Sequence, residues 1–194
     1  MTRLGQIITL ATLIACLGAL AISIYPGVLN NLLSLVVVLG VLGAPIILVI
    51  IAVVLLIQYR RGAQGDFTFP WKYSTLTLLI LGGTYVALRL YIPRRIAFAA
   101  CRPSFQRLVD EGVVDNQEFN RRIGPYYIDE CRVDERGGTY FRVYSGQDGI
   151  GPDVMSYGFC YRPNADGSPF GAAHYGVHRM GKDWYWFRVS DDWH

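Results

Sequence analysis

The feature of the sequence that most limits its fold is a long run without charge. From Leu4 to Tyr59 the chain contains no Asp, Glu, Lys, Arg or His. About a quarter of the residues in an average water-soluble domain are charged, so such a run is not typical of that class. It is typical of membrane-spanning helices, each of which needs about 20 predominantly apolar residues. The sequence therefore predicts a membrane protein with an N-terminal anchor, residues 1–92.

The predicted anchor contains three transmembrane helices. The segment PGVLNN, which begins at Pro26, separates the first two, because Pro and Gly end helices and Asn caps the next one. The predicted spans cover residues 4–25, 32–58 and 73–92, and Pro45 is expected to kink the second. The third contains a single charge. It is long enough for about 30 Å of hydrocarbon at about 1.5 Å per residue.

Aromatic residues support these boundaries. The predicted ends of the spans carry Tyr25, Tyr59, Tyr73 and Tyr91. The loop between the second and third spans, residues 60–72, contains Phe67, Phe69 and Trp71. Aromatic rings prefer the boundary between membrane and water, so we expect this loop to lie along the membrane surface.

An alternative interpretation of the N-terminus is a secretory signal peptide. The tripeptide that begins at Ala19 and ends at Ala21 fits the small-residue pattern of a cleavage site after an apolar run. Only Arg3 precedes that run, however, and the apolar sequence continues beyond Ala21. These two features favour a retained helix.

Charge is divided unequally between two parts of the chain. The first 94 residues contain six Lys or Arg and one acid, whereas the remaining hundred contain twelve Lys or Arg and fourteen acids. The excess of positive charge therefore flanks the apolar segments, where it directs topology and contacts anionic lipid. We expect the lipid bilayer as a partner and no nucleic acid.

The same charges predict the orientation. Arg3 precedes the first span, and no charge lies in the loop that follows it. The short loop before the third span contains Arg60, Arg61 and Lys72. Short loops rich in Lys and Arg stay in the cytoplasm. With three spans, the C-terminal domain is then expected on the extracytoplasmic side.

Small residues recur at four-residue spacing in every predicted span: Ala11, Ala15 and Ala19, then Gly40 and Ala44, then Gly83 and Ala87. Such faces let helices approach closely, within the chain or against a partner helix. The spans contain no His, Asp or Glu, the usual carriers of protons and ions through a membrane. We therefore expect a protein partner in the membrane rather than a channel formed by this chain alone.

Residues 93–194 are expected to form a small α+β domain. A short amphipathic helix is predicted in PSFQRLVDEG, where Pro103 lies in the first turn and Gly112 ends the helix. Five segments that follow are rich in Tyr, Phe, Val and Ile: GPYYIDECRV, TYFRVYS, VMSYGFCYR, HYGVHRM and WYWFRVS. This pattern predicts an antiparallel sheet of about five strands. We expect a plain meander, with the strands ordered as in the sequence.

The last of these segments carries large aromatic residues on both sides. Trp184 and Trp186 point to one face of a strand, and Tyr185 and Phe187 point to the other. A central strand would cover both faces. The alternative is an open aromatic platform for a protein, a lipid or a glycan. We favour the central strand.

The cysteines and histidines predict no metal site. Cys131 and Cys160 fall on the first and third strands of the meander, about 9 to 10 Å apart and too far for a disulfide, so buried free thiols are expected. His174 and His178, with Cys160, are the candidate metal ligands. On a strand, however, residues four apart lie roughly 13 Å from each other. The loops GQDGIGPD and NADGS have the composition of turns, so we expect no cofactor.

No catalytic arrangement is visible in the sequence, and we assign no catalytic residue. The leading hypothesis is a membrane-anchored, non-enzymatic binding or accessory protein that serves as a small subunit of a larger membrane assembly. The alternative is an envelope enzyme or ligand sensor with a pocket on the sheet. Its candidate residues are His174, His178, Asp148 and Asp153.

Overall fold

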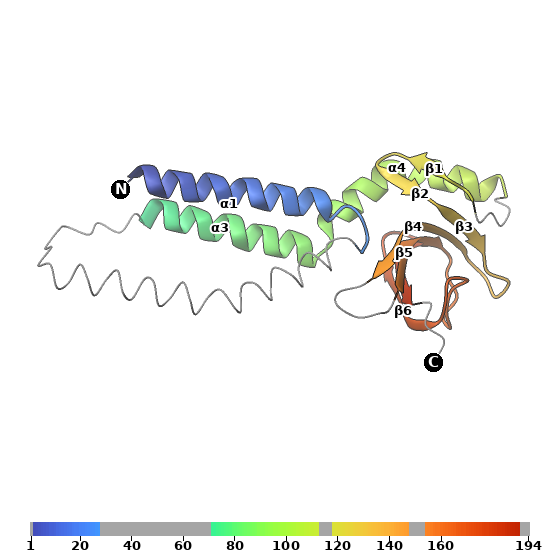
Figure 1. Cartoon of the computed structure of the whole chain (residues 1–194). Coiled ribbons are helices and arrows are strands. Elements are labelled where there is room, and N and C mark those ends of the chain that lie inside the picture. Colours follow the sequence, from blue (N-terminus) through green and yellow to red (C-terminus); the bar gives the residue numbers. More distant parts are fainter. Residues whose placement is uncertain (1, 28–70, 113–117, 148–153, 191–194) are drawn as a thin grey trace, which may run out of the picture.

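The protein is described by a computed structural model that covers residues 2–27, 71–112, 118–147 and 154–190. These residues form a pair of long helices joined to a compact part in which a third helix packs on a sheet (Figure 1). The helices are α1 (Thr2–Ile22), α3 (Trp71–Arg89) and α4 (Ile92–Asp110). The strands are β1 (Arg121–Ile123), β2 (Tyr126–Ile128), β3 (Glu130–Val133), β4 (Thr139–Gln147), β5 (Val154–Tyr161), β6 (Ala173–Arg179) and β7 (Trp184–Ser190).

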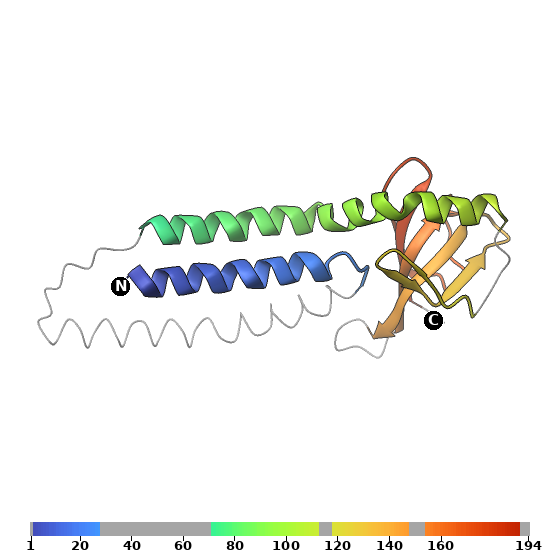
Figure 2. The same ribbon diagram turned by 90° about the horizontal axis from the view of Figure 1, so that it is seen from above.

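Helices α1 and α3 lie side by side and run in the same direction (Figures 1 and 2). Small and polar residues form their contact. The Thr9 and Thr77 hydroxyls are 3.0 Å apart, and buried residues follow at intervals of seven, with Thr9 and Cys16 in α1 and Ser23 just after its end. This spacing is two helical turns, so one narrow stripe of α1 faces its neighbour.

The stripe differs from the small-residue face that the sequence predicts. Ala11 and Ala15 are exposed, and only Ala19 of that set is partly buried. On α3, Gly83 is exposed and Ala87 is partly buried. A repeat of four drifts around a helix with 3.6 residues per turn, whereas a repeat of seven stays on one side. Gly40 and Ala44 lie outside the described residues.

The prediction of three transmembrane helices is wrong for this structure. Among the described residues, no single helix is both long and apolar enough to cross a membrane. A bent pair, Thr75–Arg89 and Ile92–Asp110, reaches that length and composition only together, with a bend of 51°. The span predicted over residues 32–58, with Pro45, lies outside the described residues.

The physical reason for this correction lies at the ends of the helices. α1 stops at Ile22, and the residues after it form turns that pack on the domain. α3 stops at Arg89, and Tyr91 takes a left-handed conformation with φ 54° and ψ 30°. A left-handed residue cannot continue a right-handed helix in the same direction, and Pro93 in the first turn of α4 lacks the N–H that would bond back to α3.

Helix α4 begins about ten residues earlier than predicted and is correspondingly longer. Pro93 lies in its first turn, and Pro103 lies inside it instead of at its start. The buried residues Arg94, Phe98, Cys101, Phe105 and Leu108 follow at helical spacing. Such a continuous stripe packed on the sheet outweighs the roughly 3 kcal/mol that an internal proline costs.

The five predicted strands are confirmed, but their order is not that of a plain meander. The large sheet has the order β3-β4-β5-β7-β6, antiparallel throughout, so β7 lies between β5 and β6. The connection over residues 162–172 carries the chain past the position of β7 to the edge of the sheet. The prediction that the last strand is central is therefore confirmed. The first predicted segment is divided, since β1 and β2 form a separate two-stranded sheet before β3 begins.

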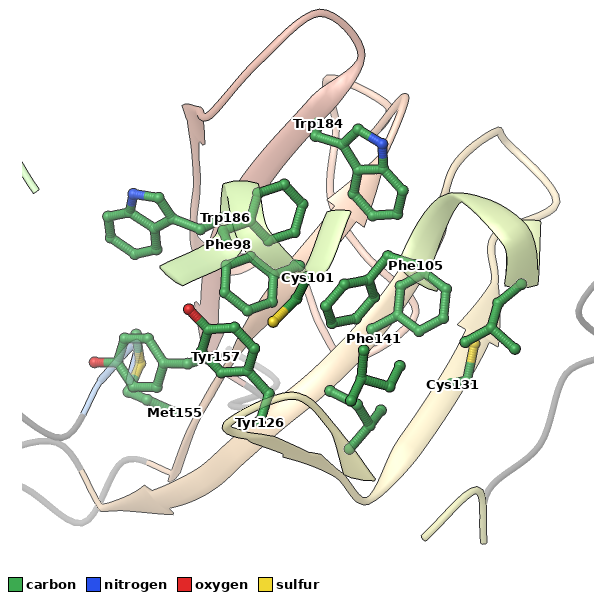
Figure 3. Close-up of a cluster of buried hydrophobic side chains, with 14 residues drawn as sticks. Phe98, Cys101, Phe105, Tyr126, Cys131, Phe141, Met155, Tyr157, Trp184 and Trp186 are labelled. Carbon is green, nitrogen blue, oxygen red and sulfur yellow. The ribbon is translucent and has the colours of Figure 1, made fainter. Parts of the chain in front are cut away.

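Side chains cover both faces of the large sheet, as its aromatic alternation predicts. Phe98 and Phe105 of α4 pack with Phe159 and Trp184 on one face (Figure 3). A smaller cluster covers the other face and contains Tyr140, Cys160, Phe170, Phe187 and Val189. Phe105 is fully buried and contacts five aromatic rings, so α4 and the sheet share one core.

Candidate functional site

The histidines considered as metal ligands do not form a site. His174 is exposed and has φ 51°, beside an irregularity in the β6–β7 pairing. His178 is also exposed, and its ring stacks on Trp186 at 4.3 Å with an interplanar angle of 15°. The part of the chain that the structure describes holds no group of three His, Cys, Asp or Glu side chains placed for a metal ion. Asp148 and Asp153 lie outside the described residues.

The cysteines are free and buried, as predicted. Cys131 lies on β3 and Cys160 on β5, with β4 between them. Burial raises the pKa of the Cys160 thiol well above its ordinary value, and it raises the pKa of Cys101 as well. A thiol held in its protonated form is a poor nucleophile and a poor metal ligand, so these residues act as core side chains.

Charged side chains along β3 and β4 pair with one another. Arg142 contacts Glu130 at 2.6 Å and Asp129 at 2.9 Å, and Arg132 donates to the carbonyl of Pro169 at 3.1 Å. The guanidiniums of Arg132 and Arg142 also lie over the ring of Phe170. Every charge in this group has a partner, and the group joins the edge of the sheet to the loop before β6.

One buried charge stands apart from this pattern. Arg94, in the first turn of α4, is 4% exposed and belongs to no ion pair that the described residues form. It lies where the end of α1, the break between α3 and α4, and the sheet meet. We define the Arg94 cage as Arg94 with its neighbours Tyr25, Tyr91, Tyr126 and Trp186.

Aromatic rings enclose the guanidinium. Its central carbon lies 4.5 Å from the ring centroid of Trp186 and 5.3 Å from that of Tyr91. Tyr91 and Trp186 contact each other edge to face at 5.4 Å. Tyr25 packs on Tyr126 in the same manner at 6.0 Å. Rings in this position stabilise a cation by about 0.5 to 2 kcal/mol each, but they accept no ordinary hydrogen bond.

The polar atoms of the cage are incompletely paired. Arg94 Nη2 donates a long hydrogen bond of 3.5 Å to the carbonyl of Tyr25. Its Nε and Nη1, together with the hydroxyl of Tyr126, are buried and have no hydrogen-bond partner among the described residues. In Figure 3, Trp186 and the hydroxyl ends of Tyr126 and Tyr157 lie on the same side of the core cluster. Three donors are therefore left open, and Arg94 and Tyr126 interact electrostatically.

Burial determines the electrostatics of the cage. It lowers the pKa of Arg94 to about 10, an effect that Tyr91, Tyr126 and Tyr157 partly offset. The guanidinium stays charged at neutral pH. Burial also raises the pKa of Tyr126, which keeps its hydroxyl protonated and able to donate. A charged donor beside a neutral donor can bind an anionic group. Neither side chain can act as a general base at neutral pH, because both hold their protons.

Comparison with protein-family models, with curated proteins and with solved structures gives no match for this chain.

The burial of Arg94 was not predicted from the sequence. In the sequence this residue is one of the cations that flank an apolar segment. The signal that reveals it is the helical spacing of Arg94, Phe98, Cys101 and Phe105, which places Arg94 on the buried face once α4 is known to begin at Ile92. That start depends on the break at Tyr91, which local sequence rules place only approximately.

Proposed function

We propose that this chain is a membrane-associated, non-enzymatic binding or accessory protein. In this proposal the α1–α3 pair contacts lipid, and the α4–sheet domain is held at the membrane surface as a small subunit of a larger membrane assembly. The observation that carries the proposal is the arrangement of side chains on the α1–α3 pair.

The α1–α3 pair has small and polar residues inside and large apolar residues outside. Ile14 of α1 is 63% exposed, and Leu78 and Leu79 of α3 are 69% and 68% exposed. The same outer faces carry Ile7, Leu10, Leu13, Leu17, Leu76, Leu81, Tyr85 and Val86. A helix in water places such residues on its buried side. The reverse arrangement supports an apolar surrounding.

The free energy of burying apolar side chains favours removing this surface from water. Removing one leucine or isoleucine side chain from water stabilises a protein by about 1.5–3 kcal/mol. About ten such side chains are exposed on the outer faces of α1 and α3. Apolar patches of this extent on proteins mark contacts with partners or membranes. We propose lipid as the surrounding of these side chains for two reasons. The uncharged run that begins in α1 extends to Tyr59. The Thr9–Thr77 hydroxyl pair lies between the two helices, as in helix pairs within membranes.

The connection to the domain supports a position close to the membrane. Only Leu90 and Tyr91 separate α3 from α4. Tyr25, just after α1, donates its hydroxyl to the carbonyl of Pro125 at 3.1 Å, and Tyr91 packs against the core of the domain. Two separate chain segments therefore attach the helix pair to the domain.

Alkaline carbonate extraction of membranes tests the association with lipid. The full chain is expected to remain in the pellet. A variant with glutamine at Leu10, Leu17, Leu78 and Leu79 is expected to move to the supernatant. The matched control has glutamine at two exposed apolar positions of the domain, Tyr127 and Val133, and should stay in the pellet. A wild-type chain found in the supernatant without detergent would overturn the proposal.

Gentle solubilisation tests the accessory role. Membranes treated with a mild uncharged detergent and a short crosslinker are expected to yield a complex of larger mass than the chain and its micelle. The glutamine variant of Tyr127 and Val133 serves as a second probe, because it alters the exposed apolar residues of the two sheets. A strictly monomeric protein under both treatments contradicts this part of the proposal.

The alternative of an enzyme or ligand sensor has less support. His178 contacts Trp186 and Tyr91, and the groups that act on it electrostatically are Arg188 and Arg94. Burial and these two cations lower the pKa of His178. A general base needs a positioned proton donor or a carboxylate that orients it, and these surroundings supply neither among the described residues. The part of that hypothesis that concerns Asp148 and Asp153 stays a prediction.

A further inference from the structure

We propose that the Arg94 cage is a binding site for the phosphate group of a ligand, with Arg94 and Tyr126 as its donors. Only the source of that phosphate, a phospholipid headgroup, rests on the proposed function.

The Arg94 cage contains polar groups that are buried without a hydrogen-bond acceptor. Arg94 Nε, Arg94 Nη1 and the Tyr126 hydroxyl are buried without an acceptor among the described residues. Buried polar groups are hydrogen-bonded in the great majority of cases, and a buried charge without a counter-ion is rarer still. The other charged side chains of the domain that are buried, Glu130 and Asp134, have ion-pair partners. An oxyanion on the Nε–Nη2 edge of the guanidinium would accept from Nε and from the Tyr126 hydroxyl and would balance the charge.

The directions of the donors favour phosphate over carboxylate. The flat face of the guanidinium is occupied by Trp186, and Nη2 is directed to the carbonyl of Tyr25. Nε and Nη2 donate along one edge of the guanidinium, whereas Nη1 points away from that edge, so one ligand group reaches Nε together with Nη2. A carboxylate would use both of its oxygens on this edge. A phosphate has further oxygens, arranged tetrahedrally, so two can accept along the edge while a third accepts from the Tyr126 hydroxyl.

The position of the cage favours a lipid headgroup as the source. The exposed apolar side chains of the helices continue up to it, with Leu90 at 53%, Ile92 at 38% and Ile96 at 66% exposure. Tyr25, Tyr91 and Trp186 surround it. Tyr and Trp are enriched where the apolar part of a membrane ends, which is also the depth of the phosphate groups. Arginine is the side chain best suited to bind them there.

Entry of a ligand requires one side of the cage to open. Tyr25 is the side that can move, because it lies in the turns after α1 rather than in a helix or strand. Its carbonyl holds Arg94 through a single hydrogen bond of 3.5 Å, long for such a bond. An oxygen of the phosphate would replace this weak acceptor, while the rings of Trp186 on β7 and of Tyr91, just before α4, stay in place.

Thermal unfolding of the full chain in an uncharged detergent tests the site, since a ligand that binds the folded state raises Tm. The probes are dihexanoyl phosphatidylglycerol, dihexanoyl glycerol without phosphate, and sodium phosphate against sodium chloride at equal ionic strength. We expect the phosphatidylglycerol to raise the Tm of the wild-type protein and of Arg95→Gln. Arg94→Gln should show no such rise. Arg95 is the matched control, because it is the neighbouring arginine in the same helical turn and is exposed.

A second variant keeps the test decisive if Arg94→Gln does not fold. Tyr126→Phe removes one open donor and preserves the ring. It should weaken phosphatidylglycerol binding by about tenfold, the usual loss for one hydrogen bond to a charged group. Without ligand, the Tm of this variant should equal or exceed that of the wild-type protein. The reason is that the Tyr126 hydroxyl of the wild-type protein is buried without a partner among the described residues.

The outcomes separate the site from the proposed function. Equal ligand response in Arg94→Gln and Arg95→Gln, or no response of the wild-type protein to any phosphate-containing probe, overturns the site. A response to sodium phosphate equal to that of phosphatidylglycerol supports the site and overturns the lipid source. A chain that carbonate removes from membranes, but whose Tm rises with sodium phosphate, refutes the proposed function and leaves the phosphate site standing.

Discussion

The central carbon of the Arg94 guanidinium lies 4.5 Å from the ring centroid of Trp186. The same indole stacks on the imidazole of His178 at 4.3 Å. Trp186 thus joins a buried cation on α4 to a titratable side chain on β6. A second positive charge at His178 would lie near Arg94, which has no acid to balance it among the described residues.

His178 therefore makes stability depend on pH. Burial, Arg188 and Arg94 lower the pKa of this histidine in the folded protein below its ordinary value. The unfolded chain then takes up the proton at a higher pH, so this contribution to stability is complete above about pH 6.5 and is lost as the pH falls through the folded pKa. In His178→Phe, which keeps a ring on Trp186, the loss of urea stability between about pH 7.5 and pH 5.5 should be smaller than in the wild-type protein.

His174→Asn is the control for His178, because His174 lies on the same strand and asparagine tolerates its positive φ, whereas the stack on Trp186 is formed by His178. Its pH dependence should follow that of the wild-type protein. If His174→Asn and His178→Phe show the same change, the stacked position of His178 is not the cause.

Asp134 produces a second pH dependence, at lower pH. Its burial opposes ionisation, but hydrogen bonds from the side chain and backbone of Arg136, with the charge of Arg136 and a hydrogen bond from Asn164, hold the pKa of the carboxyl below its ordinary value. The stability it supplies is complete above about pH 3.9 and is lost as the pH falls through the lower folded pKa. Asp134→Asn should reduce the free energy of unfolding by about 1 kcal/mol at neutral pH, since Arg136 is half exposed.

The difference between the wild-type protein and Asp134→Asn should shrink as the pH falls below about 4. Circular dichroism melts across this range measure it. Glu111→Gln, at an exposed position after α4, is the control and should leave the melts unchanged. A difference that stays constant down to about pH 2 would mean that ionisation of Asp134 is not what stabilises the loop.

The spacing between β4 and β5 makes Gly158 irreplaceable. A Cβ at this position would overlap the backbone carbonyl oxygen of Phe141 on the neighbouring strand, which cannot move without breaking the sheet. Gly158→Ala should therefore lower the free energy of unfolding by at least about 2 kcal/mol. Gly176→Ala on β6 is the matched control, since its nearest neighbour is the Arg188 side chain at 3.7 Å. It should be neutral or slightly stabilising in urea unfolding, and equal losses in both variants would contradict the argument.

The contact between α1 and α3 can be tested by crosslinking. The Thr9 and Thr77 hydroxyls are 3.0 Å apart, so cysteines at both positions should form a disulfide under mild oxidation. Cysteines at Leu10 and Leu78, the neighbouring exposed positions, should not. Mass spectrometry after alkylation of free thiols distinguishes the two. A disulfide in the Leu10 and Leu78 variant, without one in the Thr9 and Thr77 variant, would mean that a different face of α1 meets α3.

The extracytoplasmic position predicted for the domain can be tested with a label at an exposed site. Ala165 is exposed in the loop between β5 and β6. The four native cysteines are buried, so their reaction with the label should be slow. Ala165→Cys should react with a membrane-impermeant maleimide in intact cells. Reaction only after lysis would place the domain on the cytoplasmic side, and the unaltered chain gives the background.

The strands of the domain could be predicted because their signal is local. In β7, Trp184 and Trp186 face α4, and Tyr185 and Phe187 face the second cluster, as alternation along a strand requires. The free state of Cys131 and Cys160 follows from the same reasoning, since β4 separates their strands whatever the order of the later ones. The Arg94 cage could not be predicted, because its members come from the turns after α1, the break between α3 and α4, α4 itself, β2 and β7.

The sequence by itself determined which faces of the helices and strands are apolar and where strands form, because hydrophobic periodicity is a property of neighbouring residues. It did not determine the length of α4, the place of β7 between β5 and β6, or the burial of Arg94. Those depend on contacts between distant segments. The aromatic core under α4 outweighs the helix-breaking effect of Pro103, and the break at Tyr91 turns Arg94 toward Trp186. Only the tertiary structure, in which these energies compete, decided that a charge flanking an apolar segment is a buried one.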